Sequence, residues 1–319
     1  MPKQGGLGDA LWVGGYDVSG DIQSLSSING GPKTIDVTGI NVTAFQRIGG
    51  ERDGAIDMTT FFNKQGVHVP LSALPTADQL VTYCRGTTIG ADAACLNGKE
   101  INYAPKRTTS GEITFAMGSQ ANAYGLEWGK LLTTGTDGLR TDTAATNGAS
   151  YDAAAGLTTP AVPATTVPAT NTGFIPVTVV LSGGTVTLVT INGTTVGTGD
   201  GTYTLPAGAS IAVTYSAAPT WTWTPTTAYG AQAYLQVTAF TGTDVTVTLQ
   251  DSADNSSFSN IASGAFAQTT AANTTQRIAL SNSATVRRYV RAITTTVGGF
   301  TTATFGVVFM RNPVAGVSF

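Results

Sequence analysis

Charged residues are scarce in this sequence of 319 residues. Asp, Glu, Lys and Arg make up 11% of it, against roughly 25% in most soluble proteins. The net charge of −3 and the pI near 5.1 leave no basic surface of the kind that holds nucleic acid tightly. No apolar run reaches the roughly 18 residues that a membrane span requires, and the first residues lack the apolar segment of a signal peptide. We therefore expect a cytosolic product that neither crosses a membrane nor grips nucleic acid.

Side chains that carry catalysis are also scarce. The single histidine, His68, lies between two valines, which favours a structural role over a base or a metal ligand. Cys84 and Cys95 are the only thiols, too few for a four-cysteine zinc site. They are more typical of free, buried cysteines, although their spacing also allows a disulfide across a hairpin. A carboxylate pair such as Asp53 and Asp57 is no more specific than any acid-rich strand or turn. The sequence predicts no enzyme, no metal and no cofactor.

In place of charge the sequence has Thr, Ala, Ser and 39 Gly, a composition typical of β-strands and tight turns. Residues 54–63 alternate apolar and polar side chains with the period of two that a half-buried strand requires. The other local predictions are a strand over 79–86, two strands within 99–120 joined by a turn at 108–111, and short helices over 75–80 and 123–132. We expect an all-β protein with one or two short helices.

The distribution of charge marks module boundaries. None of the sixteen Lys and Arg residues lies between 141 and 276, and Asp200 is the only Asp, Glu, Lys, Arg or His between 153 and 243. A stretch with four prolines among Thr and Ala follows the first region and favours an extended linker. The predicted modules are residues 1–155, a linker over 156–173, a small Ig-like sandwich over 174–226 and a C-terminal β module over 227–319.

Two groups of side chains are candidates for binding surfaces. Trp221 and Trp223 share a face of one strand, where they form either an external aromatic platform for sugars or the core of a very small sandwich. Arg287, Arg288 and Arg291 follow one another along the strand "ATVRRYVRA". Such a strand suits an inter-subunit contact whose arginines pair with carboxylates, or a surface for nucleic acid or polysaccharide.

The stretch "QDSADNSSFSNI" (250–261) concentrates Asp251, Asp254, Asn255 and Asn260. A calcium loop of the EF-hand type needs oxygen ligands at alternate positions, a central Gly and a closing Glu. The stretch has neither the spacing nor the Gly. It predicts a strand corner in which Asp and Asn side chains bond nearby backbone amides.

Several phrases resemble those of a known family. "GGYDVSGDIQSL", "DVTGINVTAFQRIGGERDGAIDMTTFFN", "YCRGT" and "YGLEWG" are similar to segments of the major tail (tail tube) proteins of long, non-contractile-tailed phages of actinobacteria. The C-terminal "AYLQVTAFTGTDVTVTLQDSADNSSF" and "FTTATFGVVFMRNP" are similar to segments of the same proteins. The resemblance covers residues 9 to about 152 and 228 to 313. Residues 174–226 look like a bacterial Ig-like insertion.

The resemblance implies a tail-tube β-barrel or sandwich that assembles into stacked rings around a tape measure protein, with tail terminator and distal tail proteins at the ends. It implies a virion protein assembled in the host cytoplasm, through whose hollow tube DNA passes without specific binding. A neutral or negative lumen would prevent phosphate from sticking, so Glu51, Asp53 and Asp57 are the lumen-facing candidates. The N-terminal arm, 2–15, and the loop 30–39 are candidates for ring-to-ring contacts.

Two questions stay open at this point. Residues 1–155 and 228–313 are either two tube-like modules, which would give trimeric rings of sixfold appearance, or one tube domain plus an external module in a hexamer. A phage decoration protein or adhesin that binds host glycans is the alternative function. Electron microscopy distinguishes the two functions, because the first predicts tubes or stacked rings and the second predicts discrete particles.

Overall fold

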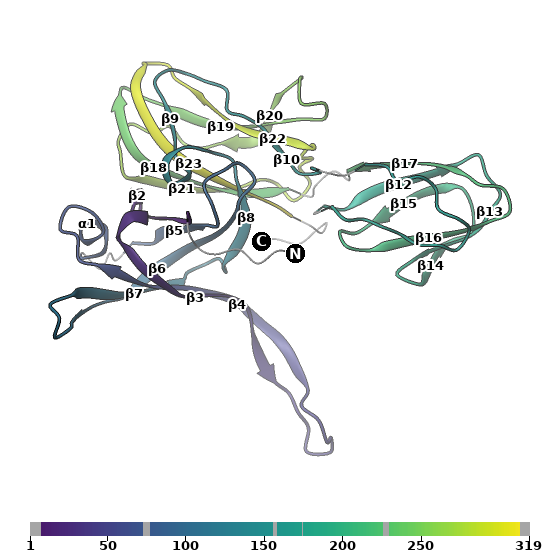
Figure 1. Ribbon diagram of the computed structural model, residues 1–319, viewed down its shortest axis with the longest axis horizontal. Coiled ribbons are helices and arrows are strands. Elements are labelled where there is room, and N and C mark those ends of the chain that lie inside the picture. The colour runs from purple at the N-terminus through teal and green to yellow at the C-terminus, as the bar shows by residue number, and fades with distance from the viewer. Residues whose placement is uncertain (1–7, 73–76, 156–157, 174, 226–229, 313–319) are drawn as a thin grey trace.

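The chain is built almost entirely of β-strands, which confirms the predicted all-β class (Figure 1). The computed structural model describes residues 8–72, 77–155, 158–173, 175–225 and 230–312. Within these ranges there is a single α-helix, α1 (His68–Leu71), and two 3-10 turns, η1 (Ser19–Asp21) and η2 (Thr136–Gly138). The sheets of the described residues do not close into a barrel.

One long sheet joins the N-terminal and C-terminal regions of the chain. Its strands follow the order β2-β1-β5-β6-β8-β23-β18-β21, with β9 paired to β23. The N-terminal strands are β1 (Ala10–Val13), β2 (Tyr16–Asp17), β5 (Gln79–Cys84), β6 (Asp92–Arg107), β8 (Glu127–Leu131) and β9 (Arg140–Asp142); the C-terminal ones are β18 (Ala231–Gly242), β21 (Thr274–Ala279) and β23 (Phe300–Arg311). Because β8 bonds to β23, with Leu131 opposite Val308, the two regions predicted as separate modules share one continuous sheet.

A second layer packs against the N-terminal end of this sheet. It consists of β3 (Ile22–Asp36), β4 (Arg47–Phe61), β7 (Ile113–Ala121) and the second half of β6, which passes from one layer into the other. The predicted alternation is confirmed in β4, where Ile56 and Met58 are buried while Asp57 and its odd-numbered neighbours are half-buried. The buried side chains pack against those of β1 and β5 in one core.

The C-terminal region forms a sandwich of its own around a further core. A four-stranded sheet of β10 (Tyr151–Asp152), β22 (Tyr289–Thr295), β19 (Thr246–Ser252) and β20 (Ser259–Ala265) packs over β18 and β23. Residues 250–257 form the predicted corner: the Asp254 carboxylate accepts hydrogen bonds from the backbone N–H groups of Ser256 and Ser257, at 2.9 Å each. These bonds hold the pKa of Asp254 well below its usual range.

The small sandwich stands apart from the rest in Figure 1. One sheet contains β11 (Ala169–Thr170), β13 (Val186–Ile191), β14 (Thr194–Gly197) and β16 (Ser210–Tyr215), and the other contains β12 (Val177–Ser182), β15 (Gly201–Leu205) and β17 (Thr220–Pro225). The Pro-rich stretch predicted as a linker packs on this sandwich: β11 pairs with β16, and the Trp221 indole donates to the carbonyl of Pro160 at 2.8 Å. Its described residues therefore belong to the module.

Both helix predictions were wrong. Residues 127–131 form β8, and residues 79–80 begin β5, while 73–76 lie outside the described residues. The Glu127 and Lys130 pair that favoured a helix instead points to opposite faces of a strand held between β6 and β23. Pairing in the middle of a large sheet overrides a helix propensity worth only tenths of a kcal/mol per residue. Cys84 and Cys95 are both free and buried on the neighbouring strands.

Candidate assembly surfaces

The chemistry-bearing side chains serve structural contacts. His68 Nδ1 lies 3.0 Å from the Tyr103 hydroxyl, and its ring packs edge-on against Phe62. Among the described residues, no three His, Cys, Asp or Glu side chains lie together as metal ligands would. Burial raises the pKa of both cysteine thiols, which keeps them protonated and unreactive.

The first surface is the outer face of the sheet β3-β4-β7-β6, whose inner face covers the core. The register places Ser27, Asp57 and Gly118 side by side across three strands, and Asn29, Ala55 and Gln120 likewise. Small and polar side chains thus form these two rows, and Lys99 and the 61% exposed Ile101 lie beside them on β6. Asp53 and Asp57, two of the lumen-facing candidates, both lie on it, because residues two apart on a strand share a face.

The acidic candidates differ in how their charge is balanced. Asp53 lies 3.3 Å from Lys33 and accepts the backbone N–H of Gly54, and these contacts lower its pKa. Asp57 accepts a hydrogen bond from the Ser27 hydroxyl at 2.7 Å. Glu51 is exposed farther along β4. The contact with Lys33 therefore offsets part of the negative charge of these candidates.

The second feature is the pair of open edges of the same sheet. β3 pairs only with β4, and β6 beyond Gly98 pairs only with β7, within the part of the chain that the structure describes. An unpaired strand edge presents rows of free N–H and C=O groups. β-Bulges interrupt β3 at three places, a device that discourages unspecific edge pairing. Two different open edges on one sheet suit a head-to-tail contact between identical copies.

The third surface is the tip of the β3–β4 hairpin, which projects from the body in Figure 1. Here large apolar side chains are exposed: Ile35, Val37, Ile40, Phe45 and Ile48. Phe45 is 72% exposed, and Ile40 is fully exposed. Exposed apolar side chains gathered on one hairpin, among them the register neighbours Ile35 and Ile48, are typical of an interaction surface. The predicted loop 30–39 contains part of this hairpin, but no local sequence pattern singles out the apolar tip.

The opposite end of the same strands is also apolar. β4 runs from Arg47 near the tip to Phe61, and there Phe61, Phe62, Val69 and Ile113 are each at least 40% exposed. The sheet therefore presents an apolar surface at each end of its strands. Residues 2–7 of the predicted N-terminal arm lie outside the described residues, and residues 10–13 form β1 within the long sheet.

The three arginines predicted for inter-subunit contact are engaged within the chain. Arg287 pairs with Asp251 at 2.5 Å, and Arg288 pairs with Asp152 at 2.7 Å. Arg291 donates to the Gln250 side chain, and its guanidinium lies 3.8 Å from the centre of the Phe258 ring. These contacts hold β22 and the two residues before it against β10, β19 and the strand corner. They give the arginines a role in the sandwich itself.

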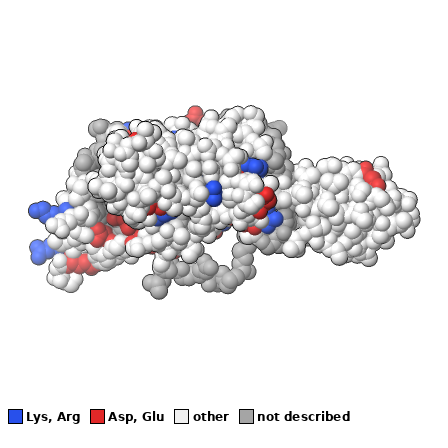
Figure 2. All heavy atoms as spheres, turned by 90° about the horizontal axis from the view of Figure 1, so that it is seen from above, with Lys and Arg blue, Asp and Glu red and all other residues white. Residues whose placement is uncertain are grey.

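The tryptophan pair is not an external platform. Trp221 and Trp223 are each 6% exposed, with ring centres 5.4 Å apart at 71°. Both belong to the core of the small sandwich, so the alternative that the sequence also allowed is the one observed. A module of this size has few other large side chains to bury. The module surface is almost free of blue and red in Figure 2.

Comparisons with known proteins give a limited result. No protein-family model matches the chain, and no curated protein matches it. Among solved structures, it is similar to the SPP1 Dit (gp 19.1) protein, described as a paradigm of the hub adsorption apparatus in phages that infect Gram-positive bacteria. The identity is 10%, the TM-score is 0.27, and the match covers 95% of this chain and 98% of the other. A TM-score of this size does not define a shared fold. In the described residues, no helix is long and apolar enough to cross a membrane.

Proposed function

We propose that the chain is a structural subunit of a phage tail and, more specifically, the major subunit that assembles into the rings of a tail tube. The observation that carries this proposal is the sheet β3-β4-β7-β6, which combines a polar outer face with two open edges. The family resemblance of the sequence points to the same function. The outer face would line the lumen, and the edges would join neighbouring copies.

The strand directions support closure into a ring. All neighbours in this sheet are antiparallel, so β3 and β6 run in opposite directions. When identical copies stand side by side in the same orientation, β6 of one copy therefore meets β3 of the next in an antiparallel pair. The alternation continues without a break around the ring, and every open edge is covered. A head-to-tail contact of this kind produces a closed ring when the rotation from one copy to the next is a whole-number fraction of a full turn.

The two apolar ends of the sheet would connect one ring to the next. The hairpin tip with Ile40 and Phe45 lies at one end of the strands, and the group around Phe62 and Ile113 lies at the other. Copies that point the same way along the tube axis would bring the tip of one ring against the opposite end of the next. Burial of apolar area at about 25 cal/mol per Å² would stabilise the stack.

The lumen chemistry suits passage of DNA without binding. Around Asp57 the face carries hydroxyl, amide and small side chains, and the nearby cations Lys33 and Lys99 are each paired with a carboxylate, Asp53 and Asp78 respectively. Binding to cations would instead hold DNA with a steep dependence on salt. A tape measure protein during assembly and terminator and distal tail proteins at the ends are the partners proposed for such a tube.

The test is electron microscopy of the purified chain and of two variants. In the first, residues 38–45 are replaced by Asn-Gly, which closes the hairpin with a two-residue turn and removes Ile40 and Phe45. We expect tubes from the wild type and unstacked rings or single subunits from this variant. The control is Val297→Asp, which changes a side chain that is 95% exposed on a turn far from the hairpin; it should still form tubes. Discrete particles from the wild type would instead favour the decoration protein or adhesin.

A further inference from the structure

A cleft of about 830 Å³ lies on the body, away from the open edges and the hairpin tip. Its floor comes from β8 and the start of β6, and its walls come from residues 88–91 and 150–155. A smaller hollow of about 190 Å³ shares Asp92, Trp128, Lys130 and Tyr151 with it and extends it toward β23. The size is within the range of small-ligand sites in proteins, roughly 300–1,000 Å³.

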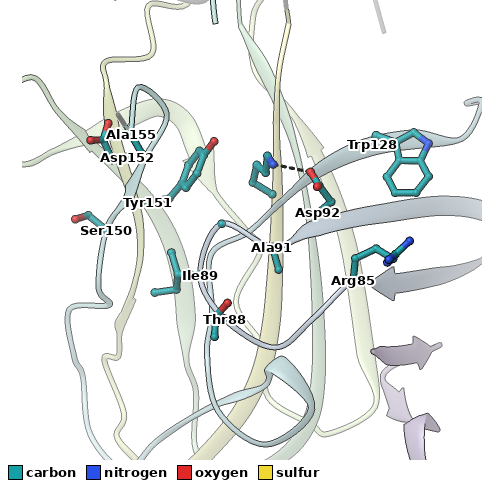
Figure 3. Close-up of a pocket in the computed structure, with 12 residues that line it drawn as sticks. Arg85, Thr88, Ile89, Ala91, Asp92, Trp128, Ser150, Tyr151, Asp152 and Ala155 are labelled. Carbon is teal, nitrogen blue, oxygen red and sulfur yellow. Dashed lines mark hydrogen bonds and ion pairs between the residues drawn. The ribbon is translucent and has the colours of Figure 1, made fainter. Parts of the chain in front are cut away.

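Trp128 is the unusual residue of this cleft. Its side chain is 54% exposed, whereas Trp12, Trp221 and Trp223 are at most 6% exposed. The next residue, Gly129, packs so closely on β23 that an added Cβ would lie 2.7 Å from the Phe309 carbonyl oxygen. β8 thus buries its Gly129 side against β23 and turns the indole outward. Figure 3 shows Trp128 and Arg85 across the cleft from Tyr151.

The charges of the cleft are balanced within the protein. Lys130 Nζ lies 2.5 Å from Asp92 Oδ1, as the dashed line in Figure 3 shows. Asp152 pairs with Arg288 at 2.7 Å, and Arg85 lies 3.8 Å from Asp9. Each charged side chain of the larger cleft thus has a partner of opposite sign, whereas Arg311 of the smaller hollow is buried and donates to the backbone carbonyls of Val286 and Arg287. The larger cleft offers no excess charge to a phosphate, a nucleic acid or an acidic peptide.

The remaining lining combines aromatic surface with hydrogen-bonding groups. Trp128 and Tyr151 supply the rings, and Thr88, Ser150 and the Asp92 carboxylate supply donors and acceptors. A pyranose ring has an apolar C–H face that packs on an indole and hydroxyls that need such donors and acceptors. We propose that this cleft binds a neutral oligosaccharide, stacked on Trp128 and hydrogen-bonded to Asp92. The proposal is independent of tube assembly, because none of these residues belongs to the surfaces assigned to it.

The position of the tryptophans provides the assay. Trp128 is the one strongly exposed indole of the four in the sequence, so acrylamide quenches its fluorescence first. We would titrate the full-length chain with cellohexaose, maltohexaose, chitohexaose and mannohexaose and measure protection from quenching, then measure affinity by calorimetry. At least one of these neutral sugars is expected to protect Trp128 saturably, with a Kd at or below the millimolar range, about −4 kcal/mol.

Two variants and one control decide the outcome. Trp128→Ala and Asp92→Asn should each weaken binding by about tenfold or more, while Val297→Ala, on a remote exposed turn, should leave the affinity unchanged. Unchanged affinity in Trp128→Ala would overturn the proposal, as would the absence of binding by every neutral hexasaccharide. Equal protection by a heparin hexasaccharide would overturn it too, since that would indicate a charged ligand. If Trp128 became protected from acrylamide quenching as the protein concentration rose, without any sugar, the cleft would be a contact site for a second copy of the chain, and the proposal would be overturned.

Discussion

Glu100 is buried without a hydrogen-bond partner, and this gives a specific prediction about stability and pH. The side chain is 8% exposed, and neither carboxylate oxygen contacts a donor within the described chain. Its register neighbour on β7, Ser119, has a hydroxyl that is buried and unpartnered too. Burial raises the pKa of Glu100 from its ordinary 4.5 to about 7, because desolvation disfavours the charged form.

The direction of the pH dependence follows from this shift. Between pH 4.5 and about 7 the folded protein binds more protons at Glu100 than the unfolded chain does, so stability falls as the pH rises through this window. Below pH 4.5 the carboxyl is neutral in both states and the cost vanishes. Above about pH 7 the full cost applies. A difference of about 2.5 pKa units at 1.36 kcal/mol per unit amounts to about 3 kcal/mol.

We expect Glu100→Gln to raise the free energy of unfolding by about 2–3 kcal/mol at pH 8.5, because the amide has nearly the same shape but no charge to bury. At pH 4.5 the same variant should differ from the wild type by less than about 1 kcal/mol. Urea denaturation of the dispersed subunit at both pH values measures this. The measurement requires a monomeric sample, because any self-association adds a concentration-dependent contribution to the free energy of unfolding.

The matched control is Glu112→Gln on the turn between β6 and β7. That carboxylate is exposed and accepts a hydrogen bond from Gln23, so its substitution should shift stability by less than about 0.5 kcal/mol at either pH. A gain for Glu100→Gln that is the same at pH 4.5 and 8.5 would refute the reasoning. It would show that packing or hydrogen bonding, rather than the buried charge, sets the difference.

Three further predictions concern the body. Arg277→Met should lower the free energy of unfolding in urea by about 3–5 kcal/mol, because the buried Glu127 carboxylate, 5% exposed and 2.9 Å from the guanidinium, loses its cation. A decrease below about 1 kcal/mol would mean that water replaces the arginine. Gly54→Ala should lower the midpoint temperature of thermal unfolding, because an added Cβ would lie 2.6 Å from the Leu126 backbone nitrogen. An unchanged midpoint would show that the segment around Leu126 moves aside. Asp57→Lys should leave tubes intact but slow DNA ejection from virions at low salt; unchanged ejection kinetics would remove this residue from the lumen.

The strands that alternate strictly were predictable from the sequence. β4 follows the apolar and polar period of two, and the strands predicted over 79–86 and within 99–120 correspond to β5, the second half of β6 and β7, with the turn at 108–111 where it was predicted. The strand corner at 250–257 was also predictable, because Asp and Asn side chains bond adjacent amides regardless of the rest of the fold. In each case the information is local.

What could not be predicted depends on contacts between distant segments. Trp128 lies in a stretch with helical composition, and only the pairing of β8 between β6 and β23 makes it an exposed residue of a strand. Arg287 and Arg288, directly before β22, suggested a contact with a partner subunit, and the structure pairs them with Asp251 and Asp152 of the same chain. The apolar hairpin tip follows from β3 and β4 extending beyond the body, which no local pattern specifies.

The small sandwich leads to the last prediction, which concerns its independence from the body. Its core is separate from those of the body, and among the described residues a small buried cluster of Ile175 with Ala153 and Ala154 connects it to the body. Deletion of residues 158–225 should therefore leave the body folded, at a cost of about 1.5–3 kcal/mol for the lost burial of one isoleucine. Calorimetry should show the transition of the body retained, and microscopy should show tubes of smaller outer diameter. Loss of cooperative unfolding in the deletion variant would show instead that the sandwich holds β10 and β8 in place, and that the chain folds as a single unit.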